Sequence, residues 1–311
     1  MYYPYLRGKQ FELLAIREYV STHLNSTDIV PIIEPVNKAV ASLQTCIKTL
    51  VSSSFKFALV LNSKEGELKH TTLNLLEQIP SLNDVQEYWI PAFVCKKISD
   101  VPSILSKFGD KNGIMIIFKD GLDTNDANIV ILSDSRIEYI VAGNCSSASI
   151  ADLVEIPDKK IICLDDKFNE RPRNADYLEV QNELFTDRPF FYKREGLHGF
   201  SDYTTLPKIF QDGGRLPWAV AIHITYQHSK REIYVGHFVS DTNDSNRDIA
   251  NKFYEACSKI DAFFNNRQDS TAAVRELISM VKPGTQKYPG LGVIKKLSIE
   301  NHLELIHNLG K

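Results

Sequence analysis

Residues 89–118 read WIPAFVCKKISDVPSILSKFGDKNGIMIIF and contain two short apolar runs, 89–94 and 114–118, separated by a stretch long enough for a helix. Five more apolar runs rich in β-branched residues lie at 2–6, 29–33, 57–61, 139–142 and 160–164. The runs lie roughly 22 to 33 residues apart, a spacing that suits repeated strand and helix units. They are continuously apolar rather than alternating, as in a parallel sheet covered on both faces. The sequence therefore predicts an α/β fold with parallel strands.

The stretches between the first four runs carry helical patterns. Phe11, Leu14 and Ile16 fall near one face of residues 10–24, and apolar residues recur with similar spacing in 40–50 and 73–79. Seven such units, with no glycine-rich dinucleotide motif after the first strand, favour a TIM-barrel-like (βα)8 parallel barrel. An open doubly wound sheet would show the same alternation. Over 127–135 and 166–188 the pattern weakens, and there we expect long loops.

The pattern changes after residue 188. Residues 190–193 have the composition of a strand, and 218–226 with 232–240 predict a β-hairpin around the polar turn 228–231. We expect one of these strands to close the barrel, with an ordered loop at 199–203 near it. Helical spacing follows in 249–260, 270–281 and 298–309. We therefore predict an α/β barrel with its closing β-hairpin over 1–243, and a C-terminal helical extension over 244–311 that packs on the barrel.

Composition excludes several classes of protein. The 311 residues are 43% hydrophobic and 24% charged, which is typical of a globular chain and not of a disordered or fibrous one. The chain has 36 Lys and Arg residues and 39 Asp and Glu residues, so its net charge is slightly negative. We therefore expect no general binding to nucleic acid. No apolar run approaches the roughly 20 residues that span a bilayer. The five cysteines form no CxxC motif, so we predict a cytoplasmic protein without membrane association, disulfide framework or thiolate zinc site.

Several segments resemble the beta-protein family of phages and bacterial accessory gene clusters. The resemblance is carried by PYLRGKQFELLAI at 4–16 and IVPIIEP at 29–35 and, for the bacterial branch, by HGFSDYTT at 198–205, IHITYQ at 222–227, IYVGHFVSD at 233–241 and KFYEA at 252–256. It covers nearly the whole chain. It implies a barrel-type α/β fold, a partner protein encoded alongside, and a setting in mobile elements or anti-phage defence. It transfers no catalytic residue.

Polar residues follow nearly every predicted barrel strand. In a parallel barrel these positions converge at the carboxyl ends of the strands, where functional sites form. A ring of mixed charge at this mouth favours a phosphorylated or carboxylate ligand. Each residue alone also has an ordinary structural explanation, as a cap or a solvated strand end. The predicted ligand-binding residues are Arg7, Lys9, Asn62, Lys119, Asp120, Asn144 and Asp202, and the predicted catalytic carboxylates are Glu34 and Asp165.

The Arg7-Gly8-Lys9 step is the strongest single feature. Gly8 permits a tight turn, and the following helix presents unpaired amide groups, so Arg7 and Lys9 would lie beside an anion site. Alternatively, Arg7 forms an ion pair with Glu34 on the neighbouring strand and only closes the mouth structurally.

Two histidines in the predicted hairpin form a second candidate site. With a suitable turn, His223 and His237 lie opposite each other, close enough for proton transfer or shared metal binding. Asp202 or Asp241 would complete a metal set with the two histidines, and Tyr203 would reach the pocket, but no ligand-spacing motif is present. A hydrogen-bonded structural role remains the simpler interpretation of each histidine. No GxSxG or GxxxxGK[ST] motif is present either.

The sequence thus supports three hypotheses. The first is a defence or mobile-element component that works with a partner protein and holds an anionic, nucleotide-like ligand at the barrel mouth. The second is a metal-dependent phosphodiesterase or nuclease-type hydrolase, and the third is a non-catalytic scaffold. The sequence identifies no cofactor.

Overall fold

The computed structural model describes residues 1–24, 26–69, 74–109, 111–214 and 216–310. The chain forms two compact units. The first contains residues 1–13, 20–166 and 188–203, and the second contains 14–19, 167–187 and the residues from 204 onward. Each unit has its own buried core.

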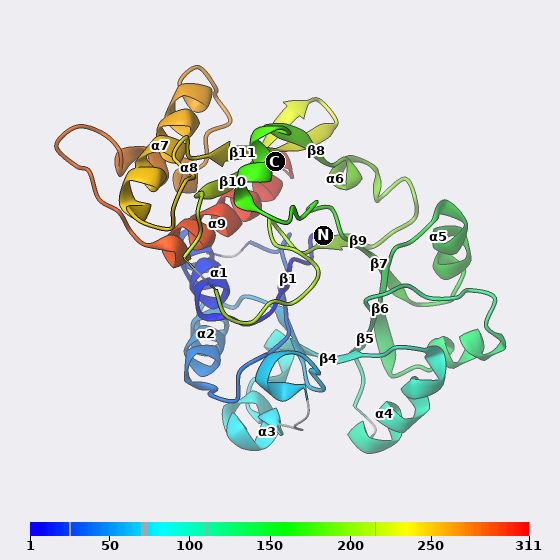
Figure 1. The fold of residues 1–311 in the computed structure, drawn as a ribbon. Helices are drawn as coiled ribbons and strands as arrows, with labels where there is room; N and C mark the ends of the chain where they lie inside the picture. The colour runs from blue at the N-terminus through cyan, green and yellow to red at the C-terminus, as the bar shows by residue number, and fades with distance from the viewer. Residues whose placement is uncertain (25, 70–73, 110, 215, 311) are drawn as a thin grey trace. The chain divides into compact units, whose positions relative to one another are not determined.

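The first unit is a nearly closed parallel barrel (Figure 1). Its strands follow the chain in the order β1 (Tyr5–Leu6), β2 (Ile32–Ile33), β3 (Phe57–Val60), β4 (Trp89–Val94), β5 (Ile114–Phe118), β6 (Ile137–Gly143), β7 (Lys160–Asp165) and β9 (Gly199–Asp202). Tyr2 forms a parallel bridge with Phe200, and the amide of Tyr3 donates to the Phe200 carbonyl at 2.8 Å. The last strand therefore returns to the first, and the predicted TIM-like barrel is confirmed over the open sheet.

Helical segments connect the strands. They are α1 (Gln10–Thr22), α2 (Ala41–Ser52), α3 (Leu75–Gln78), α4 (Val101–Phe108), α5 (Ser147–Val154) and α6 (Arg188–Phe191), with short 3-10 turns at 66–68, 80–83, 86–88, 98–100 and 127–133. In Figure 1, α2 to α5 lie outside the ring of strands. Inside the ring, successive strands contribute buried side chains that include Tyr5, Ile32, Val60, Ile90, Met115, Tyr139, Ile162 and Leu164. Burial on both faces explains why the strands are continuously apolar.

Strand β9, and not the predicted hairpin, closes the barrel. The segment 199–203 was expected to be an ordered loop, and it contains two polar residues, Ser201 and Asp202. Both are buried, and the Ser201 hydroxyl donates to the Tyr3 carbonyl at 2.5 Å while Asp202 accepts from the Tyr2 hydroxyl at 2.6 Å. The prediction of a strand at 190–193 is also wrong, because residues 188–191 form α6.

The second unit combines a three-stranded antiparallel sheet with helices. Its strands are β8 (Asn182–Thr186), β10 (Ala221–Ser229) and β11 (Glu232–Val239), in the order β10-β11-β8, preceded by a 3-10 turn at 174–178. Its helices are α7 (Ile249–Phe264), α8 (Ala272–Ser279) and α9 (Leu291–Leu309). Ile222 and Ile224 of β10 share one apolar core with Phe253, Leu277 and Leu297 of the three helices. The predicted hairpin therefore exists but groups with the C-terminal helices, so the expected boundary at residue 243 does not separate the two units.

Candidate functional site

Three hydrogen-bond donors surround one buried carboxylate at the barrel mouth, that of the predicted residue Glu34. Glu34 follows β2 and is 1% exposed. Its Oε2 accepts hydrogen bonds from the Tyr5 hydroxyl at 2.6 Å and from Lys119 Nζ at 3.0 Å, and its Oε1 accepts from the Ser63 hydroxyl at 3.2 Å. Burial, followed by the charge of Glu34, raises the pKa of Tyr5 well above its ordinary value. Tyr5 is therefore a neutral hydrogen-bond donor to the side chain of Glu34.

A second carboxylate, Glu65, bridges the two cations of the mouth. Its Oε1 lies 2.5 Å from Lys119 Nζ, and its Oε2 lies 3.5 Å from Arg7 Nε. Glu65 follows β3 in the loop that precedes a short 3-10 turn, and its side chain is 22% exposed. Arg7 and Lys119 are thus spaced so that one anionic group contacts both.

Backbone and aromatic contacts hold Arg7 in place. Its guanidinium carbon lies 4.4 Å from the centre of the Tyr203 ring, a cation–π distance, and its amide donates to Glu12 of α1 at 2.5 Å. Gly8 has a φ of 61°, and a Cβ there would lie 3.3 Å from the Glu34 carbonyl oxygen. The tight turn expected at Gly8 is present, and a side chain is disfavoured both by φ and by space.

The other predicted mouth residues make local structural contacts. Asn62 exchanges two 2.8 Å hydrogen bonds with the backbone of Val94, which ties β3 to β4. Asp165 forms an ion pair with Arg188 at 3.0 Å, and Arg188 also contacts Glu195. The described contacts of Asn62 and Asp165 are therefore with Val94 and Arg188, and not with Glu34.

The remaining predicted residues are peripheral or buried. Asn144, with a φ of 51°, donates from its side-chain amide to the Asp120 carbonyl at 3.4 Å, and both residues are exposed. Lys9 is partly exposed at the start of α1. Asp202 is 2% exposed and bonded to Tyr2, so its carboxylate serves the closure of the barrel.

The two histidines of the hairpin face each other in the second unit. His223 and His237 are direct partners in the β10-β11 register, and their Nδ1 atoms lie 2.8 Å apart. Nε2 of His237 lies 3.2 Å from Glu183 Oε1. The rings of Phe168 and Tyr177 pack against both imidazoles, at 4.5 to 6.3 Å between ring centres.

This chain of contacts determines the tautomers. Burial lowers the pKa of His237, although Glu183 opposes the shift, and burial with the neighbouring imidazole lowers the pKa of His223 to about 3. Both rings are therefore neutral at pH 7. His237 donates its Nε2 proton to Glu183, so its Nδ1 accepts the Nδ1 proton of His223. Nε2 of His223 is left as an unprotonated nitrogen.

The sequence missed several residues that complete these clusters. Tyr5 lay inside a predicted strand, Ser63 was not predicted at all, and Glu183 fell in a stretch expected to be a loop. Glu65 lies only three residues beyond the predicted Asn62, in the same loop after the third strand. A charged residue anywhere in such a loop, and not only at its first position, is therefore a signal for the site.

No protein-family model matches the chain, and no curated protein matches it. Within the described residues, no group of three or more His, Cys, Asp or Glu side chains is placed to hold a metal ion. None of the helices in that part of the chain is both long enough and apolar enough to cross a membrane.

Proposed function

We propose that the mouth of the barrel binds a small ligand through a phosphate or carboxylate group, and that the protein acts with a partner in a bacterial defence or mobile-element module. The proposal about the ligand rests on the geometry of Arg7, Lys119 and Glu65. The proposal about the module rests on the family resemblance alone.

The bridging contact of Glu65 carries the ligand proposal. A side-chain carboxylate already lies between an arginine and a lysine, and a ligand anion needs the same two partners. Glu34 orients Lys119 through a separate hydrogen bond, which Lys119 Nζ donates at 3.0 Å. The ligand would therefore replace Glu65, which is partly exposed, and leave the buried Glu34 in place.

Titration with inorganic phosphate tests this proposal on the full chain. Glu65→Gln should bind phosphate about tenfold more tightly than the wild type, because the competing charge-assisted contact is removed. Lys119→Met should weaken binding, and Lys107→Met, an exposed lysine of α4, is the matched control. Calorimetry gives the affinities. A misfolded variant cannot gain affinity, so tighter phosphate binding by Glu65→Gln would support the proposal. Unchanged phosphate affinity in Glu65→Gln would contradict it.

A phage-challenge assay tests the cellular context. Cells that carry the gene together with its neighbour should resist infection, and Lys119→Met should abolish that resistance while Lys107→Met retains it. Resistance that persists without the neighbouring gene would remove the partner from the proposal. Resistance that persists with Lys119→Met would favour a non-catalytic scaffold.

The hydrolase alternative has less support. Its carboxylates, Glu34 and Asp165, are each held by a cation of the barrel, and its histidines belong to the other compact unit. The Nδ1 atoms of the two histidines are bonded to each other. The anion-binding proposal needs only contacts within the barrel.

A further inference from the structure

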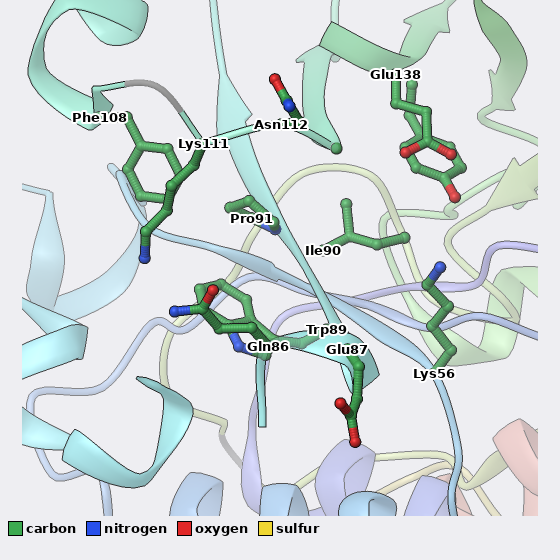
Figure 2. Close-up of a pocket in the computed structure, with 12 residues that line it drawn as sticks. Lys56, Gln86, Glu87, Trp89, Ile90, Pro91, Phe108, Lys111, Asn112 and Glu138 are labelled. Carbon is green, nitrogen blue, oxygen red and sulfur yellow. The ribbon is translucent and has the colours of Figure 1, made fainter. Parts of the chain in front are cut away.

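A cavity of about 330 Å³ lies at the amino-terminal ends of the central barrel strands, away from the residues of the mouth (Figure 2). Its lining comes from the residue before β3, the first three residues of β4, the loop before β5 and the start of β6. Ligand pockets usually begin at roughly this size. The sequence pattern does not indicate this site, because the functional residues of a parallel barrel are expected at the carboxyl ends of its strands.

Three aromatic side chains line the cavity, and each is fixed by its own neighbours. The Trp89 indole donates to the Leu82 carbonyl at 2.9 Å. Phe108 packs edge-on against Phe93, with ring centres 5.1 Å apart. Tyr139 is 3% exposed and belongs to the barrel core. The walls are therefore already formed and offer flat apolar surfaces to a ligand.

Two lysines, Lys56 and Lys111, line the cavity together with the carboxylate of Glu138. Glu138 is paired with Lys160 at 2.6 Å, and this contact holds the pKa of Glu138 below its ordinary value although burial opposes the shift. Lys111 Nζ lies 5.4 Å from the centre of the Phe108 ring. The charge of Lys56 also lowers the pKa of Glu138, whereas Lys111, within the described part of the chain, forms no ion pair with a carboxylate.

Figure 2 shows the two lysines on opposite sides of Ile90 and Pro91, while Glu87 extends away from these two residues. The amide side chains of Gln86 and Asn112 also line the cavity. A ligand here thus meets aromatic walls, amide groups and the ammonium group of Lys111, which has no carboxylate partner among the residues that the structure describes.

From these contacts we propose that the cavity binds a planar aromatic ligand that carries a negative charge. The ring packs against Phe108 and Trp89, and the anionic group contacts Lys111 or Lys56. This site is separate from the proposed anion site at the mouth, which uses Arg7 and Lys119 and has no aromatic slot of this kind in the described contacts.

Fluorescence provides a direct test on the full chain. The protein has 2 tryptophans, and Trp218 is 62% exposed, so Trp218→Phe leaves Trp89 as the sole reporter. The probe is anilinonaphthalene sulfonate, and the measured signal is energy transfer from Trp89 to the bound probe. Phenyl naphthylamine, which has the same rings without the sulfonate, is the uncharged control ligand.

The expected result separates charge from ring contacts. Lys111→Met or Lys56→Met should weaken sulfonate binding about tenfold and leave the uncharged probe unaffected, whereas Phe108→Ala should weaken both. Lys107→Met should change neither, since Lys107 does not line the cavity. Equal affinity for the two probes, or sulfonate binding insensitive to both lysine variants, would overturn the proposal even if Phe108→Ala fails to fold.

Discussion

Replacing Glu34 by glutamine should destabilise the barrel substantially. The change keeps the shape of the side chain and removes its charge, while Tyr5, Ser63 and Lys119 remain around it. A hydrogen bond to a charged group contributes about 1.5–3 kcal/mol, and one between neutral groups about 0.5–1.5 kcal/mol. Each of the three donors therefore loses about 1 kcal/mol, and we expect Glu34→Gln to lower the free energy of unfolding by about 3 kcal/mol.

Urea unfolding followed by circular dichroism measures this loss as a lower midpoint at an unchanged slope. The control is Glu65→Gln, the same chemical change in a carboxylate that also contacts Lys119 but is 22% exposed. Because solvent screens that pair, the expected loss is about 1 kcal/mol or less. Equal losses for the two variants, or a loss below about 1 kcal/mol for Glu34→Gln, would refute the reasoning that burial makes Glu34 the structural carboxylate of the mouth.

Three further predictions concern other parts of the chain. Gly143→Ala should lower the free energy of unfolding in urea by about 3 kcal/mol, because its Cβ would lie 2.1 Å from the Lys119 carbonyl oxygen. An unchanged free energy would mean that the backbone at this strand end moves to accommodate the methyl group. Nitrogen NMR at pH 7 should show His223 protonated at Nδ1 and not at Nε2. Since its folded pKa of about 3 lies below the ordinary 6.5, the free energy of unfolding should fall as the pH drops below about 6.5, and His223→Gln should reduce that slope. Burial raises the pKa of Glu300 to about 8 from 4.5, so its contribution to stability is full below pH 4.5 and is lost as the pH rises through 8. Glu300→Gln should therefore have a higher urea midpoint than the wild type at pH 9 and a similar one at pH 4.5, and a constant difference would contradict the shift.

The sequence predicted the barrel because its strands are buried on both faces and leave an unmistakable apolar signal. Strand β9 was missed for the opposite reason. This strand is only four residues long and includes Ser201 and Asp202. The hydrogen-bond partners of these two polar side chains are Tyr3 and Tyr2, which lie at the other end of the barrel sequence. A local pattern cannot report a partner of this kind.

The candidate sites show the same division. Arg7, Glu34 and Lys119 were predicted because they follow strands, and parallel strands end at a common edge. The contacts that distinguish them from Asn62 and Asp165 depend on loop conformations that strand spacing does not determine. Which carboxylate is buried and which is exposed became apparent only from the three-dimensional arrangement.

The bridge between Tyr2 and Phe200 also determines when the barrel can form. The ring joins residues that are about two hundred positions apart, so during synthesis the first seven strands emerge before the strand that closes them. Until then, β1 and β7 both have unpaired edges, which are surfaces for misassociation with other chains. The final pairing carries a large loop-closure cost and places the barrel among folds rich in nonlocal contacts. Closure of the ring is therefore the step at which we expect this chain to depend most on assistance during folding.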